Sequence, residues 1–502
     1  MKIVSAKHLP ALDQATIEAQ NISSAQLMER AAHETYYRFV EDFYGSEYAV
    51  FCGSGNNGGD GWVLARLLSS QHRVIVYDCQ IGERSSDNAL NYQLAKEIPG
   101  IEIITVESAD DVRDLNDPKL VVIDALFGSG LSRPVTGVWA GVIRQINATT
   151  GTVISIDLPS GVFADRFTDG THVQANLTYS LGTPKLAEFA VDNAKAYGKI
   201  ESVDIQLAAE ALEAIDATFF TQDVDNLRAT LKDRSFFDHK GTFGHALIAA
   251  GSQGKIGAAT LCASAALRAG AGLVTAHLPR CGYEIAQIAL PEAMCQIDRH
   301  RFVVTEIPGS QRYNAIGIGP GMGTNELTAA ALEKFIRHTD QPLVLDADAL
   351  NILSVRQNLL EQLPGGSILT PHPKEFARLF GETDNDFARW ELLREKCQAL
   401  NLVIVLKGGN TAIGTPDGRV TFNTNGNPGM GTGGTGDVLT GIITGLMAQG
   451  YPSVDAAKLG VYLHGSAGDL AATELEQESL LATDVIDHLG KAFRALRAQG
   501  EN

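Results

Sequence analysis

Short apolar runs alternate with segments of helical periodicity along most of the chain. In the first half, four runs rich in valine and isoleucine predict buried strands, at residues 48–53, 73–78, 120–128 and 152–161. Segments 62–70 and 138–148, which lie between these runs, repeat their apolar residues at helical spacing. Strands that alternate with helices predict a parallel sheet with helical crossovers.

The pattern changes after about residue 205. Residues 207–237 are acidic and helical in character, contain no predicted strand and are typical of a domain junction. Strands resume within 239–252 and are then predicted at 272–278, 315–319, 342–350, 367–371 and 402–409. We place the boundary near 220–235, between a domain of residues 1–220 and one of residues 235–502. No motif recurs in both halves, so we expect a fusion of two different α/β domains.

Composition narrows the choice of partners. A chain of 502 residues exceeds one ordinary core, and 44% hydrophobic with 20% charged residues is normal for a soluble globular protein. The formal net charge of −19 argues against nucleic acid or an anionic membrane surface as a partner. The six cysteines show no C-x-x-C pair, which favours buried, reduced thiols. With no signal-peptide pattern and no long apolar stretch, we expect a cytoplasmic protein.

A glycine-rich motif, GSGNNGGDG at 53–61, lies between a predicted strand and a predicted helix. Asp78 ends the next predicted strand 20 residues after Gly58, which is the spacing of a ribose-binding acid in dinucleotide sites. Two asparagines and Asp60, however, stand where a pyrophosphate cradle presents bare backbone, and Asp60 could equally be an ordinary N-cap. A dinucleotide site, a capped turn and a specialised site remain open.

Oxygen-bearing side chains follow three predicted strands. Asn57, Asp124 and Ser160 supply one carboxylate among neutral oxygens, which suits a weakly charged ion such as K⁺ better than Mg²⁺. The alternative for Asp124 is that it only caps the next turn. Asp157, also at a strand end, is a candidate acid/base group. Lys185 is either its helper or a solvated surface lysine.

Three motifs together resemble NAD(P)H-hydrate epimerase domains over residues 1–215: GSGNNGGDG, VVIDALFGSGLSRPV (121–135) and SIDLPSGV (155–162). The resemblance implies a Rossmann-like fold that interconverts the two C6 epimers of hydrated NAD(P)H, with Asp157 in contact with the substrate. It implies that K⁺ is held by Asn57, Asp124 and Ser160. It also implies a substrate-binding set comprising Asn56, Asn57, Gly58, Gly59, Asp60, Gly128, Ser129, Gly130, Leu131, Ser132, Arg133, Pro134 and Asp157.

The second half contains another glycine-rich loop, NPGMGTGGTGD at 427–437. Apolar residues at helical spacing follow it, so the loop runs into a helix N-terminus, where free amides and the helix dipole favour an anion. No strand with a terminal acid lies about 20 residues further on, and the G-K-[ST] of a P-loop is missing. Asp437 is either an N-cap or a base beside this anion site.

Three further motifs extend the comparison: HKGTFG (239–244), TPHPKE (370–375) and KGGNT (407–411). With the loop, they resemble the ADP-dependent NAD(P)H-hydrate dehydratases of the ribokinase-like superfamily over residues 235–495. The resemblance implies phosphorylation of the C6 hydroxyl, then loss of phosphate, with Asp437 as base and Mg²⁺ bridging the nucleotide phosphates. It implies hydrate contacts from Ala258, Gly323, His372 and Asp437. The implied ADP contacts are Lys407, Gly408, Gly409, Asn410, Thr411 and Gly436.

Together the resemblances imply a bifunctional repair enzyme for hydrated NADH and NADPH. The first domain would interconvert the R and S epimers, and the second would return the S epimer to NAD(P)H. We expect a homo-oligomer, a tetramer or larger. One alternative is a ribokinase-like kinase for a vitamin precursor fused to a regulatory domain. Another is that the first half only senses a nucleotide.

Overall fold

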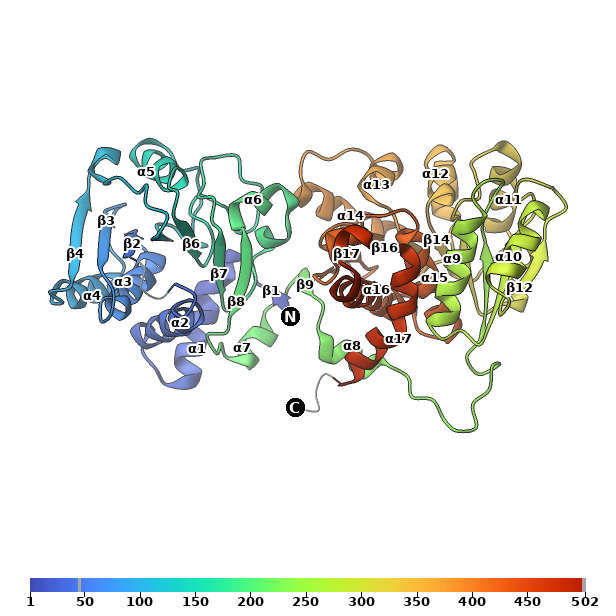
Figure 1. The fold of residues 1–502 in the computed structure, drawn as a ribbon, viewed down its shortest axis with the longest axis horizontal. Helices are drawn as coiled ribbons and strands as arrows, with labels where there is room; N and C mark the ends of the chain where they lie inside the picture. Colours follow the sequence, from blue (N-terminus) through green and yellow to red (C-terminus); the bar gives the residue numbers. More distant parts are fainter. Residues whose placement is uncertain (44–46, 499–502) are drawn as a thin grey trace. The chain divides into compact units, whose positions relative to one another are not determined.

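The computed structural model describes residues 1–43 and 47–498. The chain divides into two compact units, which we call the N-terminal unit (Met1–Phe219 with Asn385–Phe387) and the C-terminal unit (Phe220–Asp384 and the chain from Ala388 on). Each unit has its own sheet, in which parallel pairs predominate (Figure 1). The predicted α/β fold class is therefore confirmed.

The N-terminal unit contains eight strands and seven α-helices among its described residues. In chain order they are β1 (Lys2–Ile3), α1 (Leu9–Gln20), α2 (Ser24–Phe39), β2 (Glu47–Cys52), α3 (Asn56–Leu68), β3 (Val74–Cys79), α4 (Ser86–Lys96), β4 (Ile101–Val106), β5 (Leu120–Ala125), α5 (Gly137–Asn147), β6 (Thr152–Ile156), β7 (Leu177–Leu181), α6 (Ala194–Tyr197), β8 (Lys199–Val203) and α7 (Ala209–Ala214).

The sheet of the N-terminal unit has the order β4-β3-β2-β5-β6-β7-β8, and all its pairs are parallel. Alternate residues of one strand enter different cores: Val121 and Ile123 pack with α3, whereas Val122 packs with α5. The strand order reverses between β2 and β5. In open α/β sheets, a ligand crevice forms at such a reversal, outside the carboxyl ends of the strands.

The C-terminal unit begins with β9 (Phe219–Thr221), which straddles the boundary between the units. Its remaining elements are α8 (Val224–Thr230), β10 (His245–Ala249), α9 (Ile256–Arg268), β11 (Leu273–Leu278), α10 (Tyr283–Ala289), β12 (Met294–Ile297), β13 (Ala315–Ile318), α11 (Glu326–Ile336), β14 (Leu343–Leu345), α12 (Asp348–Val355), β15 (Ile368–Leu369), α13 (Pro373–Phe380), α14 (Asp386–Leu400), β16 (Val403–Leu406), β17 (Thr411–Gly414), β18 (Val420–Asn423), α15 (Thr435–Ala448), α16 (Ser453–Leu475) and α17 (Ala482–Ala498).

Its sheet runs β9-β18-β17-β16-β15-β14-β13-β10-β11-β12, with antiparallel pairing only of β16 with β17 and β17 with β18 among the strand pairs described here. The order reverses between β10 and β13, which places a second ligand crevice. Helices α9 and α15 pack closely because a Cβ on Gly441 would overlap the carbonyl oxygen of Cys262. One prediction was wrong: the junction 207–237, which was expected to contain no strand, contains β9. The amide of Gln222, directly after β9, donates to the carbonyl of Phe422 at 2.9 Å.

Candidate active sites

The predicted K⁺ ligands of the N-terminal unit lie together at the reversal of its sheet. Asn57 is in the first turn of α3, Asp124 is on β5 and Ser160 follows β6. The Asn57 Nδ2 donates to the carbonyl of Phe127 at 2.9 Å, and the Ser160 hydroxyl accepts from the Phe127 amide at 2.8 Å. The Ser160 amide in turn donates to Asp124 Oδ2 at 2.8 Å. A single hydrogen-bonded cluster therefore joins three separate strand ends.

Within this cluster, Asp124 does more than cap a turn. It accepts the local bond from the Leu126 amide at 3.3 Å, as a turn cap would, but also a 2.8 Å bond from the Ser155 hydroxyl. Burial raises the pKa of the Asp124 carboxyl, and its hydrogen bonds with Ser160 oppose the rise. The Asn57 Oδ1 is buried and has no hydrogen-bond partner among the described residues. That oxygen is left for a cation or a water.

In the motif GSGNNGGDG, residues 53–55 form the turn after β2 and residues 56–61 form the first turns of α3. The N-cap is Gly55, so the interpretation of Asp60 as an N-cap was wrong. A Cβ on Gly58 would overlap the carbonyl oxygen of Gly53, so this glycine is needed for close packing. Asp78, the possible ribose acid, is buried and paired with Arg84 Nη2 at 2.5 Å.

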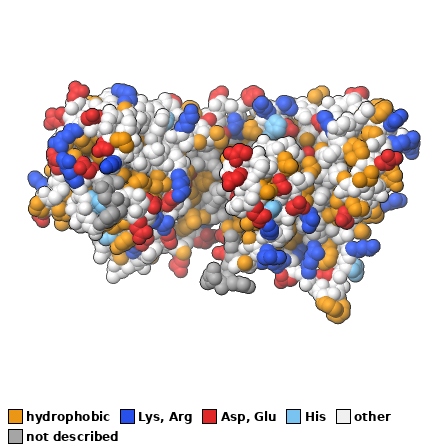
Figure 2. All heavy atoms as spheres, in the orientation of Figure 1, with side chains coloured by type: hydrophobic (Ala, Val, Ile, Leu, Met, Phe, Trp, Pro, Cys, Tyr) orange, Lys and Arg blue, Asp and Glu red, His pale blue; other side chains and the backbone are white. Residues whose placement is uncertain are grey.

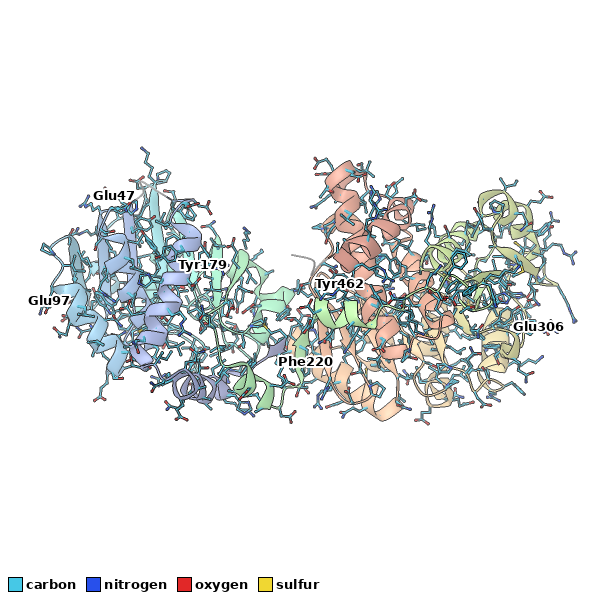
Figure 3. All side chains as sticks on the ribbon, turned by 90° about the horizontal axis from the view of Figure 1, so that it is seen from below. Glu47, Glu97, Tyr179, Phe220, Glu306 and Tyr462 are labelled. Carbon is cyan, nitrogen blue, oxygen red and sulfur yellow. The ribbon has the colours of Figure 1, made fainter. Side chains whose placement is uncertain are left out.

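Asp157 lies directly after β6, with a backbone φ of 68°, in the left-handed region that side chains rarely adopt. Its amide donates to the carbonyl of Tyr179 (Figure 3) at 2.8 Å, and this bond anchors the turn to β7. Its Oδ2 accepts from the Ser129 amide at 3.2 Å. Asp157 therefore faces the segment 128–134, which contains the other predicted substrate contacts.

Lys185 is not a solvated surface lysine, and that interpretation was wrong. Its side chain is 2% exposed and forms an ion pair with Asp157 Oδ1. It also donates to the Leu181 carbonyl at 2.8 Å. Lys185 immediately precedes a short 3₁₀ turn at Leu186–Phe189, which packs into the core and carries the preceding lysine inward.

Asp13 is a site residue that the sequence analysis missed. It lies on α1, and burial, followed by the charge of Asp157, raises the pKa of Asp13 to about 6. The same two causes, burial first, raise the pKa of Asp60 well above its ordinary value. Asp60 lies in the predicted motif, whereas Asp13 has no pattern around it that would distinguish it from a helix-surface aspartate.

In the C-terminal unit, the sequence-predicted hydrate contacts lie around the second reversal. Gly323 follows β13 with a φ of 81°, and its amide donates to Asp348 Oδ2 at 2.8 Å. Ala258 is on the first turn of α9, close to the turn after β13, since a Cβ on Gly321 would lie 3.0 Å from the Ala258 Cβ. His372 begins α13 as its N-cap. Its Nδ1 accepts from the amides of Lys374 and Glu375.

The loop 427–437 runs into α15, as predicted, but Asp437 does not cap that helix. The N-cap is Gly434, with a φ of 99°, and Asp437 is the third helical residue. A Cβ added at Gly433 would meet no atom within 4 Å. The same holds for Gly408 and Gly409, in the turn after β16. Both backbone segments are therefore open to a ligand.

A buried network underlies these segments. Lys407 Nζ donates to Asp346 Oδ1 at 2.8 Å and lies 3.9 Å from Glu375 Oε2. The hydroxyl of Thr440, on α15, donates to the other Asp346 oxygen at 2.7 Å. Asp346 follows β14 directly, and the sequence analysis interpreted that stretch only as a strand. The network joins the predicted nucleotide-binding lysine to the helix that carries Asp437.

Charge and burial shift the pKa values of three candidate groups of this site. Burial, then the charges of Asp346 and Asp348, raises the pKa of Asp437 to about 7, although Lys407 opposes the rise. Burial acts to lower the pKa of Lys407, but the carboxylates of Asp346 and Glu375 outweigh it and the pKa is raised. Burial lowers the pKa of His372, so the imidazole is neutral at pH 7. Asp437 is thus suited to exchange a proton near neutral pH.

A cavity of about 470 Å³ lies elsewhere in the C-terminal unit, lined by residues that include His277, Asp298 and Tyr313. None of its lining residues belongs to the predicted dehydratase site. Among the described residues, no helix is both long and apolar enough to cross a membrane.

Two α/β units, each with a candidate acid/base carboxylate near the reversal of its sheet, define a two-domain α/β protein. Comparison with known proteins identifies both halves. Residues 24–187 match the YjeF-related protein N-terminus, and residues 246–491 match NAD(P)H-hydrate dehydratase. The bifunctional NAD(P)H-hydrate repair enzyme Nnr of Moorella thermoacetica is 35% identical, over 100% of this chain and 98% of its own. That of Thermofilum pendens is 34% identical with the same coverage.

The chain therefore belongs to the family of bifunctional NAD(P)H-hydrate repair enzymes. Its membership, predicted from the motifs, is confirmed over the full length, whereas a vitamin-precursor kinase with a regulatory domain would not account for both halves. Among solved structures, an ADP/ATP-dependent NAD(P)H-hydrate dehydratase from Bacillus subtilis, co-crystallised with ATP and Mg²⁺, is 33% identical. It covers 55% of this chain and 98% of its own, with a TM-score of 0.49.

Proposed function

We propose that the protein repairs hydrated NADH and NADPH in two steps, one in each unit. The N-terminal unit interconverts the R and S epimers at C6, and the C-terminal unit dehydrates the S epimer at the expense of ADP. The observation that carries this proposal is that Asp157 and Asp437 lie in separate units, each beside open backbone, the first paired with the buried Lys185 and the second near the half-buried Lys407. We assign the epimerase to residues 1–220 and the dehydratase to residues 235–502.

In the epimerase site, Asp157 is the proposed acid/base group. Inversion at a carbon that bears a hydroxyl next to nitrogen requires proton movement, and the carboxylate faces the segment where the substrate would lie. Gly128 lies beside this carboxylate, since a Cβ there would lie 3.4 Å from Asp157 Oδ2, at van der Waals contact. The first turn of α3, Asn56 to Asp60, and the segment Gly128 to Pro134 hold the hydrated cofactor.

We assign K⁺ to the cluster of Asn57, Asp124 and Ser160, with the Phe127 carbonyl beside them. The fit rests on the unpartnered Asn57 Oδ1 and on a donor set with one carboxylate among neutral oxygens. Bound there, K⁺ would supply a positive charge that orders the strand ends. Its test has a readout besides activity: K⁺ should raise the unfolding temperature of the N-terminal unit more than Li⁺ does. In Asp124→Asn this difference should vanish.

In the dehydratase site, Asp437 takes the proton of the C6 hydroxyl as that oxygen attacks the terminal phosphoryl group of ADP. The new O–P bond forms as the P–O bond to AMP breaks. The C6–O bond then breaks with release of phosphate, and loss of a proton from C5 restores the dihydronicotinamide. Lys407, the turn to Thr411 and the amide of Gly436 bind the phosphates.

Mg²⁺ is the proposed companion of the nucleotide. Such ions bind through one or two carboxylates together with substrate phosphates. Burial first, and then the charges of Asp346 and Asp348, raise the pKa of Asp437, so a cation beside these acids would be favourable. The residues present therefore fit it: Asp348 would hold the ion together with the phosphates, and Asp437 remains the base. When bound, Mg²⁺ would neutralise phosphate charge.

One assay tests both halves. The protein is incubated with both epimers of hydrated NADH, ADP and Mg²⁺, and the absorbance of the dihydronicotinamide is followed. We expect full recovery with the natural sequence, partial recovery with Asp157→Asn beyond slow spontaneous epimerisation, and none with Asp437→Ala. Undiminished recovery with Asp437→Ala would overturn the catalytic assignment.

Two wider expectations remain predictions. A homo-oligomer, a tetramer or larger, is supported by large apolar side chains at the surface, since Phe236 is 94% and Phe237 86% exposed. Light scattering would measure its mass. A reducing, cytoplasmic location is supported by the six free cysteines, although Cys281 and Cys295 are half-buried and not buried as expected. On the face drawn in Figure 2, acidic and basic side chains are interspersed, which fits a small-molecule substrate rather than nucleic acid.

A further inference from the structure

Lys185 is more deeply buried than Asp157, to which it is paired. This position allows it to hold the Asp157 carboxylate in place but not to contact the substrate directly. The lysine side chain is 2% exposed, and that of Asp157 is 14% exposed. The ammonium has three partners: the Asp157 carboxylate, the Leu181 carbonyl at 2.8 Å and the Ser180 hydroxyl at 3.4 Å. An ammonium has three protons, so its donors are all engaged.

The groups that face this ion pair are acidic. Asp13 comes from α1, Asp60 from α3 and Glu188 from the 3₁₀ turn after Lys185. Tyr197, on α6, is a buried phenol that also interacts with Asp157. Burial raises the pKa of Glu188, and Lys185 opposes the rise. Lys185 is therefore a cation surrounded by acidic groups, and it is paired directly with Asp157.

The orientation of Asp157 is fixed at both carboxylate oxygens. Lys185 binds Oδ1 and the Ser129 amide donates to Oδ2 at 3.2 Å. The backbone is held in the left-handed region by the bond to the Tyr179 carbonyl. Without Lys185, the carboxylate would keep one partner, the Ser129 amide, and could rotate away from the reacting carbon. A base that is no longer held in position is a poorer catalyst.

We propose that Lys185 is the positioning residue of the epimerase: it holds the Asp157 carboxylate aimed at the C6 hydroxyl. The inference rests on the proposed function. Asp157 takes the hydroxyl proton, the C6–O bond becomes a carbonyl, the C6–N1 bond breaks, and the carboxyl of Asp60, whose pKa burial raises well above its ordinary value, protonates N1. Closure on the other face of the carbonyl reverses each transfer and yields the other epimer.

The test compares kcat and KM of the epimerase at pH 7 for the natural sequence, Lys185→Met and a control, Lys199→Met, whose side chain is 73% exposed. For Lys185→Met we expect kcat to fall about 10- to 100-fold, because the base is misoriented. KM should change less than kcat, and the control should match the natural sequence.

A second variant keeps the proposal testable if Lys185→Met folds poorly. Lys185→Ala removes the ammonium and leaves space for a small amine, so ethylammonium should restore activity in a saturable manner, whereas propanol should not. An unchanged kcat in Lys185→Met, or equal rescue of Lys185→Ala by propanol, would overturn the inference. If instead Asp157→Asn keeps full epimerase activity, the proposed function itself fails. The two failures are therefore distinguishable.

Discussion

The two candidate catalytic aspartates differ in what their neighbouring lysine does. In the N-terminal unit, Lys185 binds Asp157 itself. In the C-terminal unit, Lys407 binds a different acid, Asp346, at 2.8 Å, and Asp437 is left beside acidic neighbours. Burial and these neighbours raise the pKa of Asp437 to about 7. The same residue types, at the same kind of sheet reversal, thus produce one paired and one repelled carboxylate.

This difference matches the chemistry proposed for each site. A base that activates a hydroxyl for attack on phosphorus works best when its pKa is near the working pH. Asp437 meets that requirement because it lacks a direct cationic partner. Asp157 has a lysine bound directly to its carboxylate. Two aspartates can therefore be given distinct properties by residues far away in the chain.

The largest expected effect separates the sites by activity. Asp437→Asn should lower the dehydratase rate by about 10²- to 10⁴-fold, since a positioned acid/base group contributes that much. Epimerase turnover, followed as interconversion of the two hydrate peaks by chromatography, should stay unchanged. Asp233→Asn, at a carboxylate whose side chain is 95% exposed, is the matched control. Loss of both activities in Asp437→Asn would break the separation.

Asp157→Asn should destabilise the N-terminal unit. The substitution leaves the buried Lys185 ammonium without its carboxylate, which costs about 3–5 kcal/mol when one partner of a buried pair is removed. Calorimetry should show a lower unfolding temperature for this unit. The double variant Lys185→Met/Asp157→Asn should recover stability but not epimerase activity. Equal stability of Asp157→Asn and the natural sequence would contradict the pairing.

Asp437→Asn should have the opposite effect on stability. The folded state raises the pKa of Asp437 from 3.8 to about 7, so it binds more protons than the unfolded state between these values. Stability from this group therefore falls as pH rises through that window, and the ionised carboxylate is unfavourable at pH 8. Removing it should stabilise the C-terminal unit by up to about 4 kcal/mol at pH 8. Unfolding temperatures measured at pH 4 should show almost no difference.

The smallest expected effect is a shift of a pH profile. The dehydratase rate should fall below about pH 7, where Asp437 becomes protonated. Asp346→Asn removes a charge that raises the pKa of Asp437 and frees Lys407 to approach it. The acid limb should then move to lower pH by about one unit. Single-turnover rates between pH 5 and 9 measure this, and a shift to higher pH would disprove the role given to Asp346.

Sequence patterns predicted the strands that carry the sites but not all the others. The four strands predicted in the first half correspond to β2, β3, β5 and β6, because their buried valines and isoleucines form continuous runs. Strand β4 was missed, since it lies at the sheet edge and only Val106 of its six residues is buried. The antiparallel pair β17 and β18 was missed because threonines and an asparagine interrupt their apolar residues.

The site residues divide in a similar way. The glycine-rich motifs identified the two loops at the sheet reversals, since glycines are needed there for close packing and open backbone. Whether Asp60 and Asp437 cap their helices was not decidable, because helix starts differ by a few residues from pattern boundaries. Lys185, Asp346 and Asp13 carried no local signal, although GTPK and LDAD contain the first two.

By itself the sequence determined the α/β class, the order of the elements, the family and the residue types in each site. Only the tertiary structure decided which charges meet. Lys185 is 28 residues from Asp157, and Thr440 is 94 residues from Asp346, so these pairs depend on strand order and helix packing. Electrostatic interactions depend on distance and burial, and neither is encoded in the spacing of residues along the chain. The different properties of the two aspartates are therefore consequences of the fold.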